Sequence, residues 1–275
     1  MADLRTVYRR PLSALDNLGS ELAFYLRALA WTPRVLRRYR KEILRLLAEV
    51  TLGSGALAVI GGSVGVITAL AFFTGTEVGL QGYAALNQIG TALFSGFVSA
   101  YFNTREISPL VAGIALAATV GCGFTAQLGA MRISEEVDAL EVMAIPSLPF
   151  LVTTRIIAGL VAVIPLYIVG LLSSYFATRL VVTKFYGQSQ GTYDHYFTLF
   201  LPPGDVLWSF GKVLVFAVVV ILIHCYHGYH ASGGPAGVGV AVGRAVRTSI
   251  VAINVIDLFL SMAIWGTTTT VRLAG

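Results

Sequence analysis

Four carboxylates within seven residues are the densest chemical feature of this sequence. Glu135, Glu136, Asp138 and Glu141 lie in the segment ISEEVDALEVMAI, residues 133–145, between two apolar stretches. Carboxylates grouped in this way can carry out acid–base catalysis or bind a metal ion. No histidine lies nearby in the sequence to complete either kind of site, so we expect neither a catalytic residue nor a metal ion here.

The same segment has the pattern of a short amphipathic helix over residues 134–145. Ser134 is suited to the N-cap, the acidic residues after it favour the positive end of the helix dipole, and Pro146 is expected to end the helix. One stripe of this helix is apolar and contains Val137, Leu140 and Ala144. The opposite stripe is acidic and contains Glu135, Asp138 and Glu141. Two interpretations remain open: a solvated connection, or a helix that docks into a groove on a cytosolic partner.

Two further clusters could do chemistry. In HCYHGYH, residues 224–230, His224 and His227 are one helical turn apart, which could hold a metal ion; polar and aromatic residues at a membrane boundary are the favoured explanation. A glycine-rich, flexible loop is expected over 226–246, with Arg244 and Arg247 forming a second cytoplasmic contact. The loop follows no strand and the chain has no GxxxxGK[ST] motif, so we expect no nucleotide or other cofactor bound by this chain.

The elements that must carry these residues are membrane helices. The chain has 275 residues, of which 56% are hydrophobic and 12% charged, and its mean hydropathy is +0.78. Soluble domains carry about 25% charged residues, and apolar runs of about 20 residues are typical of membrane spans. Ten of the 19 Lys and Arg residues precede residue 46, a bias typical of a cytoplasmic segment facing the membrane. We therefore expect a polytopic membrane protein with no nucleic-acid partner.

The order of apolar and polar stretches predicts an N-terminal interfacial part, residues 1–50, and a membrane domain, residues 51–275. Leucines three or four residues apart between 12 and 31 predict an amphipathic helix in the interface. The stretch 83–104 either crosses the membrane, giving six spans, or forms a re-entrant or outer-interface hairpin, giving five. Five spans place 14 of the 19 basic residues inside, with the N-terminus cytoplasmic and the C-terminus outside, and are favoured. The five expected spans lie near 53–74, 109–131, 151–182, 207–225 and 247–267.

Motifs along nearly the whole chain resemble those of the MlaE/YrbE permeases of ABC-type lipid transporters. They are GLQGY (79–83), REISPLVAG (105–113), GFTAQLGAMR (123–132), GAMRISEEVDALEVMAI and LVTTRIIAG. More narrowly, GQSQGTYDHYF, GGPAGVGVAVGRAVRTS and YRKEILRLLAEVTLG are similar to the B-type YrbE subunits of actinobacterial Mce systems, above all the sterol-associated one. The implied fold is an all-α integral membrane protein with an MlaE-type permease domain and a cytoplasmic coupling helix.

The resemblance also implies partners. The carboxylate helix would be the coupling helix, seated in a groove of a separate ATPase dimer of MceG or MlaF type that binds ATP and magnesium. The residues implied in this contact are Glu135, Glu136, Asp138, Leu140, Glu141 and Met143. A second permease subunit of A type and an outer ring or tube of MCE-domain proteins are implied as well. The substrate would be a hydrophobic lipid, such as a sterol or a fatty acid, imported from that tube.

Two outer regions are candidates for lipid handling and docking. The resemblance implies that Glu106, in REISP, faces a lipid pocket, and Arg105, Asn87 and Gln88 are the other candidates for this pathway. Alternatively, Arg105 and Glu106 form a local ion pair that caps a helix. The loop after the third span is rich in aromatic residues, as in an interfacial belt or a docking surface for MCE proteins. Its candidate docking residues are Tyr193, His195, Tyr196 and Phe197.

Two other functions are alternatives to an ATP-driven permease. A secondary transporter needs charges or broken helices inside the membrane, whereas the expected spans carry almost no charge apart from Arg105 and Glu106. A scaffold that only anchors MCE proteins would lose no lipid uptake when the carboxylate helix is disrupted. An ATP-driven permease subunit, itself not an enzyme, is therefore the favoured function.

Overall fold

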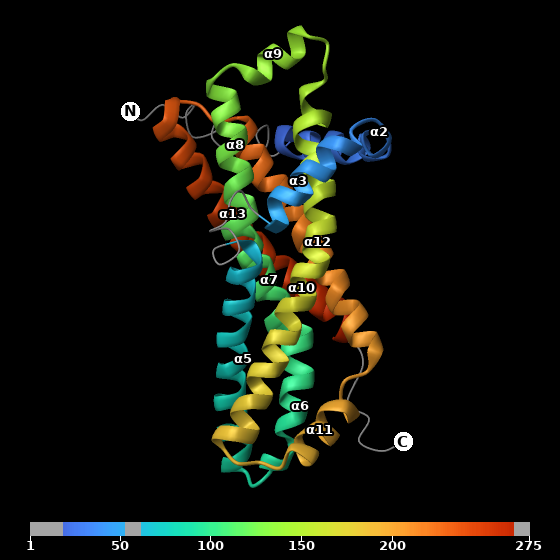
Figure 1. Cartoon of the computed structure of the whole chain (residues 1–275), viewed down its shortest axis with the longest axis vertical. Helices are drawn as coiled ribbons and strands as arrows, with labels where there is room; N and C mark the ends of the chain where they lie inside the picture. Colours follow the sequence, from blue (N-terminus) through green and yellow to red (C-terminus); the bar gives the residue numbers. More distant parts are fainter. Residues whose placement is uncertain (1–18, 53–61, 267–275) are drawn as a thin grey trace, which may run out of the picture.

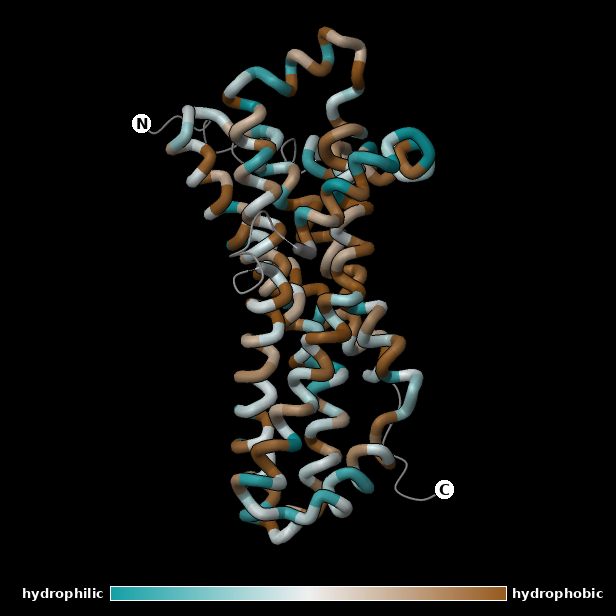
Figure 2. Tube along the Cα trace, viewed as in Figure 1, coloured by the Kyte–Doolittle hydropathy of each residue, from teal (hydrophilic) through white to brown (hydrophobic). Residues whose placement is uncertain are grey.

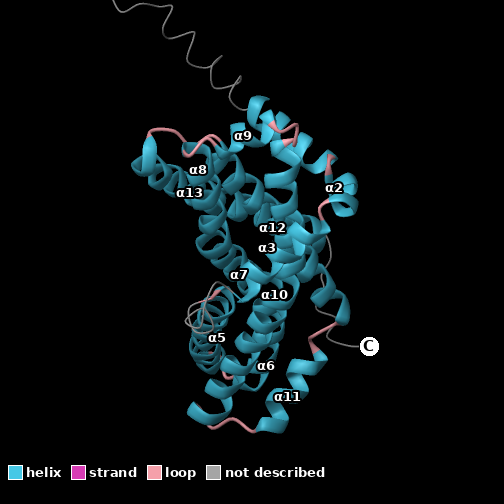
Figure 3. Cartoon of the chain, turned by 45° about the horizontal axis from the view of Figure 1, so that its top comes forward, coloured by secondary structure: helices cyan, strands magenta, loops and turns pink. Residues whose placement is uncertain are grey.

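The computed structural model describes residues 19–52 and 62–266, and every regular element in these ranges is helical (Figures 1 and 3). Five helices are long and apolar enough to cross a membrane. They are Ser63–Gln88, Ala92–Ile133, Pro149–Phe185, Pro203–Tyr229 and Gly234–Trp265. The expected all-α fold with five spans is confirmed.

The stretch 83–104 is a hairpin between the first two spans. Helix α5 (Ser63–Gln88) ends in a turn in which the Thr91 amide donates to the Leu86 carbonyl oxygen at 2.9 Å. Gly90 takes a left-handed φ of 71°, as glycine often does just after a helix. The next helix begins at Ala92, so this stretch does not add a sixth crossing. The first span therefore runs further along the chain than expected: α5 continues through Glu77 and Gln81 to Gln88, whereas residues 53–61 of the expected span lie outside the described residues.

The second and third spans are longer than a bilayer requires. Ala92–Ile133 contains α6 (Ser95–Val98), α7 (Ser108–Leu116) and α8 (Cys122–Ile133), joined by the π-helical stretches Ser99–Ile107 and Ala117–Gly121. At 1.5 Å per residue, its 42 residues reach about 63 Å, roughly twice the apolar thickness of a bilayer. The third span, of 37 residues, includes α10 (Thr154–Leu180). Both spans therefore extend beyond the membrane at one end, where they hold α9 (Glu136–Val142) between them (Figure 1).

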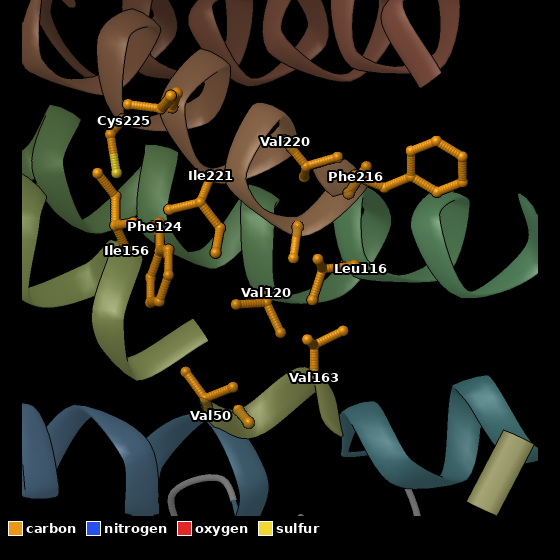
Figure 4. Close-up of a cluster of buried hydrophobic side chains, with 14 of the residues drawn as sticks. Val50, Leu116, Val120, Phe124, Ile156, Val163, Phe216, Val220, Ile221 and Cys225 are labelled. Atoms are coloured by element: carbon orange, nitrogen blue, oxygen red, sulfur yellow. The ribbon is translucent and has the colours of Figure 1, made fainter. Parts of the chain in front are cut away.

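The bundle is held together by close helix contacts. Ile67, Ala71, Gly75 and Gly79 recur every four residues and form the buried face of α5. A Cβ atom at Gly75 would lie 2.4 Å from the Ser174 carbonyl oxygen of α10, so only glycine permits this approach. The central core joins α3 (Arg40–Leu52), α7, α8, α10 and α12 (Pro203–Tyr229), with these labelled residues in Figure 4: Val50, Leu116, Val120, Phe124, Ile156, Val163, Phe216, Val220, Ile221 and Cys225.

The N-terminal helices surround the bundle at the end that carries α9. They are residues 19–30, α2 (Thr32–Arg38) and α3. Val35, Ile43 and Leu46 pack against the third span, whereas Leu22, Leu26 and Leu29 remain exposed. An exposed leucine stripe beside a membrane domain fits a helix lying in the interface. Hydrophilic segments gather at both ends of the molecule (Figure 2), which we call the α9 end and the α11 end after the helices there, α11 being Gln190–Leu199.

Candidate functional site

Helix α9 projects from one end of the bundle (Figure 1), and most of its side chains are exposed. All four carboxylates of the segment are exposed, and so are two apolar residues at its far end, Val142 at 89% and Met143 at 61%. Val137 is 1% exposed and anchors the helix to the core, and Leu140 is half-buried. An exposed helix that combines acidic and apolar side chains has the composition of a docking surface.

Both ends of α9 are set by left-handed residues. Glu135 has φ 60° and is the N-cap residue, whereas Ser134 completes α8, where its hydroxyl donates to the Ala130 carbonyl oxygen at 3.1 Å. The expected N-cap at Ser134 is therefore wrong, because Ser134 is the C-cap of α8 and Glu135 is the N-cap of α9. At the other end Ala144 has φ 57°, and the Ile145 amide donates to the Leu140 carbonyl oxygen at 2.9 Å. This Schellman motif ends the helix at Val142, before Pro146 is reached.

Side-chain bonds tie α9 to its neighbours. Arg132 of α8 forms an ion pair with Asp138 at 2.5 Å. The Ser147 hydroxyl donates to the Glu141 carboxylate at 2.6 Å and also contacts the Tyr229 hydroxyl, at the end of α12, at 2.7 Å. A push on α9 would therefore reach α8, the third span and α12 together. Glu135 and Glu136, at the start of the helix, are exposed.

A second site is a network of charges buried between the second span, α12 and α13 (Gly234–Trp265). The Arg105 guanidinium pairs with Asp205, with Nε donating to Oδ2 at 2.7 Å. The Lys212 ammonium lies 2.6 Å from Oδ1 of Asp257 and 3.3 Å from Oε2 of Glu106. Arg105, Asp205, Lys212 and Asp257 are each 8% exposed or less. Because buried charges are costly unless paired, these contacts hold three helices to one arrangement.

Polar and aromatic neighbours complete the network. The Ser261 hydroxyl donates to Oε1 of Glu106 at 2.8 Å and accepts from Lys212 at 2.8 Å. Trp265 Nε1 donates to Oδ1 of Asp205 at 3.0 Å, and the Arg105 guanidinium lies 4.1 Å from the centre of the Tyr101 ring. Two cations thus face three carboxylates, so the network carries a formal charge of −1 when all five groups are ionised.

The network corrects two expectations. Arg105 and Glu106 do not pair with each other: Arg105 pairs with Asp205, and Glu106 contacts Lys212 and Ser261. The spans were also expected to carry almost no charge besides Arg105 and Glu106. They carry three more charged residues in this network: Asp205, Lys212 and Asp257. A single ionisable residue within an apolar helix was the available signal, since such residues rarely lie in a membrane without a partner.

The other two residues of the expected lipid pathway lie elsewhere. Asn87 and Gln88 are exposed at the hairpin end of α5 and do not join the charge network. The structure instead has an apolar groove of about 690 Å³ between α5 and the start of the second span. Its lining residues are Thr74, Glu77, Val78, Gln81, Gly82, Ala85, Leu86, Phe97, Val98, Phe102 and Ile107. This groove is a candidate site for an apolar ligand.

The histidine cluster does not form a metal site. His224 is fully buried, and its Nδ1 contacts the Thr125 hydroxyl at 2.8 Å. His227 and His230 instead line a pocket of about 570 Å³ near the α9 end, together with Glu21 and Arg244. Within residues 19–52 and 62–266, no three His, Cys, Asp or Glu side chains come close enough to hold a metal ion.

The glycine-rich stretch after α12 is mostly helix rather than a flexible loop. Helix α13 starts at Gly234, just after Gly233 with φ 88°, and Pro235 stands in its first turn, where proline needs no amide partner. Arg244 and Arg247 are both exposed on this helix, near the α9 end. They are therefore held on a rigid element, and any contact they make with a partner would be made from a fixed position.

At the opposite end, α11 packs its aromatic residues against the bundle. Tyr193 is 1% exposed, and its backbone approaches α6 so closely that a Cβ atom at Gly96 would lie 2.4 Å from its carbonyl oxygen. Phe197 stacks near Tyr193 and also meets Tyr175 of α10. Of the four expected docking residues, His195 is exposed, Tyr196 and Phe197 are half-buried, and Tyr193 is inaccessible.

Comparison with known proteins places this arrangement in a family. The family described as Permease MlaE matches residues 53–263. The chain is 30% identical to a probable ABC transporter permease protein of Rickettsia bellii, over 72% of this chain and 77% of that protein. It is 31% identical to the chloroplastic protein TRIGALACTOSYLDIACYLGLYCEROL 1 of Arabidopsis thaliana, over 72% and 57%, respectively. It is 27% identical to the intermembrane phospholipid transport system permease protein MlaE of Haemophilus influenzae, over 70% and 75%. With five membrane-spanning helices and a match over most of its length, the chain belongs to the MlaE family of ABC transporter permeases.

Proposed function

We propose that this chain is the permease subunit of an ATP-driven lipid importer in which α9 receives motion from a separate ATPase dimer. As an ABC transporter permease, the chain is not itself the catalytic subunit and depends on an ATPase partner. The observation that carries the proposal is the construction of α9: exposed acidic and apolar side chains on a short helix that ends in a Schellman motif and is tied to α8 through Arg132 and to α12 through Ser147. A rigid helix of this kind transmits rigid-body motion, whereas a flexible loop would absorb it.

The proposed orientation puts the α9 end in the cytoplasm. Basic residues are concentrated at that end, on the N-terminal helices, the end of α8 and the start of α13, and cytoplasmic loops carry an excess of Lys and Arg. They include Arg27, Arg34, Arg37, Arg38, Arg40, Lys41, Arg45, Arg132, Arg244 and Arg247. The α11 end would then face outward, and the membrane would be the inner, cytoplasmic one.

The proposed partners occupy three surfaces. The ATPase dimer, of MceG or MlaF type, binds α9, with Arg244 and Arg247 as a second contact. A second permease of A type covers the exposed faces of α5 and α13, where only 22% and 17% of the most apolar stretch is buried within this chain. The ring or tube of MCE-domain proteins docks at the α11 end. Burial of Tyr193 limits that contact to the exposed His195 and the half-buried Tyr196 and Phe197.

The proposed cargo is a hydrophobic lipid, such as a sterol, a fatty acid or a phospholipid. Support comes from the groove beside α5, whose lining is mainly aliphatic and aromatic and whose volume of about 690 Å³ is in the range of small-molecule sites. The relative from Haemophilus influenzae is described as part of a phospholipid transport system. The proposal that this chain belongs to the sterol-associated Mce subtype rests on the resemblance of its sequence motifs alone.

One observation favours a second candidate, ion-coupled secondary transport. The buried Lys212 and Asp257, with the half-buried Glu106, form a titratable network of the kind that lines proton and ion pathways in transporters. An ion-coupled carrier would move lipid in membranes that contain no ATPase. An ATP-driven permease would not, and the buried network would then serve to hold the helices.

The test of α9 introduces lysine at two residues that are already exposed. Glu136→Lys combined with Met143→Lys should abolish co-purification of the ATPase and ATP-dependent lipid transfer in reconstituted membranes, because it removes acidic and apolar contacts without disturbing Val137. His195→Glu, an equally exposed charge change at the α11 end, is the matched control and should leave ATPase binding intact. Normal ATPase recovery and normal transfer in the α9 variant would refute the coupling role.

A further inference from the structure

Two pockets near the α9 end share one wall, the helix of residues 19–30. One is a polar pocket of about 570 Å³ between this helix, the end of α12 and the start of α13. The other is an apolar pocket of about 450 Å³ between the same three helices. Glu21 lines both, so the two pockets meet at this residue and form one amphipathic site.

The chemistry of the lining changes with position along α12. Its polar lining residues lie where the helix ends, near the α9 end: Tyr226, His227 and His230. Its apolar lining residues lie one to two turns earlier, toward the middle of the span: Val219, Leu222 and Ile223. A polar part at the membrane boundary and an apolar part toward the bilayer centre match the head and the tails of one phospholipid molecule.

Two opposite charges line the polar pocket, the exposed Arg244 guanidinium and the half-buried Glu21 carboxylate. No ion pair joins these two groups within the described part of the chain. One oxygen of Glu21 accepts from the Tyr25 hydroxyl, and a carboxylate has further acceptor positions for a ligand. A guanidinium binds phosphate well, whereas a carboxylate attracts an ammonium group. The two charges therefore suit a head that carries both phosphate and ammonium.

The helix that carries Glu21 is held in place by packing. Phe24 is 7% exposed, and its ring centre lies 5.4 Å from that of Tyr226 in α12. The Thr153 hydroxyl, in the third span, donates to the Ala28 carbonyl oxygen at 2.8 Å. These contacts fix the wall of the site, so little order would have to be gained when a ligand binds.

We propose that this site binds a phospholipid with a primary ammonium head, of the phosphatidylethanolamine class, from the leaflet at the α9 end. Its phosphate binds Arg244, its ammonium group donates to Glu21, and an acyl chain lies against Leu22, Val219 and Ile223. A quaternary ammonium head, as in phosphatidylcholine, has no N–H group to donate, and a head with only negative charge is repelled by Glu21. A guanidinium has five N–H donors, so Arg244 can hold phosphate and still take part in the proposed ATPase contact.

This lipid is assigned a structural role, not that of cargo. The site lies near the α9 end, whereas the apolar groove beside α5 lies in the half of the molecule that carries α11 (Figure 1). A lipid between residues 19–30, α12 and α13 would join the interfacial helix to two spans. The inference goes beyond the proposed transport function and does not depend on it.

The experiment compares three photoreactive phospholipids on the complete transporter complex in nanodiscs. They carry the same diazirine-labelled acyl chain and differ only in the head, which is ethanolamine, choline or glycerol. Labelled peptides covering residues 19–30 and 215–231 are quantified by mass spectrometry. Because the tails are identical, a difference in labelling reports the head alone. Nanodiscs expose both leaflets to the probes, so the result does not depend on the orientation of the transporter.

The wild type should be labelled by the ethanolamine probe about fivefold more than by either other probe, because a partly exposed ion pair contributes up to about this factor. Glu21→Gln, which keeps an acceptor for Tyr25, should lower ethanolamine labelling to the level of the choline probe. Arg244→Gln should lower labelling by all three probes, since each carries a phosphate. Arg27→Gln removes an exposed cation on the same helix that lines neither pocket, so this matched control should change nothing.

The proposal is overturned by equal labelling with the three heads in the wild type, by a preference that survives Glu21→Gln, or by labelling with none of the probes. Should one of the two variants fail to assemble, the other decides. ATP-dependent lipid transfer is measured on the same preparations. Normal transfer without a head preference rejects only this lipid site, whereas a clear preference in a wild type that transfers no lipid with ATP rejects the transport function and leaves the site standing.

Discussion

Helix α9 and the buried charge network both contain ion pairs. The pairs differ in solvent exposure and in how far apart the two partners lie in the sequence. At α9, Arg132 pairs with Asp138 only six residues away, and both side chains are substantially exposed. In the network, Arg105 and Asp205 are 100 residues apart and nearly inaccessible to solvent. Exposed pairs contribute at most about 1 kcal/mol, whereas breaking a buried pair costs about 3–5 kcal/mol.

This contrast indicates that α9 serves to bind a partner, whereas the charge network serves to stabilise the fold. Charges at α9 are available to a partner and contribute little to the stability of this chain, as expected of a docking surface. Charges in the network are occupied with one another and hold the second span, α12 and α13 together. Substitutions at α9 should therefore affect coupling without unfolding the protein, and substitutions in the network should affect stability first.

The largest effect should follow from Lys212→Met. This change leaves the buried Asp257 and the half-buried Glu106 without their cation, so we expect a loss of about 3–5 kcal/mol of stability and a strongly lowered Tm in detergent. The matched exposed variant, Asp138→Asn, should change stability by less than about 1 kcal/mol. Adding Asp257→Asn to Lys212→Met should restore part of the loss. Equal effects of the buried and the exposed variants would break the comparison.

Ser147→Ala tests the mechanical link between the regions. Among the described residues, the Ser147 hydroxyl bridges Glu141 of α9 and Tyr229 of α12, and its loss should cost about 1 kcal/mol. The ATPase should still bind, because the exposed face of α9 is unchanged, but ATP-dependent lipid transfer should fall. Transfer at the wild-type rate with normal ATPase binding would show that α9 passes its motion only through the backbone.

The same difference, between contacts among neighbouring residues and contacts between residues far apart in the sequence, explains what the sequence could predict. The five spans and the amphipathic α9 follow from local hydropathy and periodicity, and both were predicted. The ends of α9 were not, because Ser134 caps the end of α8 and Ala144 takes a left-handed conformation that alanine rarely adopts. The network was missed because nothing near Lys212 in the sequence indicates that Asp257 and Glu106 will lie beside it. The groove was missed for the same reason, since its two walls meet only once α5 and the second span fold into a hairpin.

A smaller effect is expected at the end of α9. Ala144→Gly should stabilise the helix end by about 0.5 kcal/mol, because relief of a left-handed alanine outweighs the greater freedom of glycine in the unfolded chain. The matched change Ala139→Gly, inside the same helix, should destabilise it by about 1 kcal/mol. Hydrogen exchange of the amides from 136 to 145 measures both. Effects of the same sign would mean that the conformation at Ala144 is not what holds α9.

The smallest effect concerns an exposed ion pair at the α11 end, between Arg179 and Asp194 at 2.7 Å. Its hydrogen bonds with the Arg179 guanidinium lower the pKa of Asp194 below its usual value. A carboxylate with a lowered pKa stabilises the fold above its unfolded pKa of about 3.9, and this contribution disappears as the pH falls through the folded pKa. Because both side chains are about half exposed, the contribution should stay below about 1 kcal/mol. The Tm of Asp194→Asn should therefore lie slightly below that of the wild type at pH 6, and the two should converge below about pH 4. If Asp194→Asn lowered the Tm as much as Lys212→Met does, solvent exposure would not determine how much an ion pair contributes to the stability of this protein.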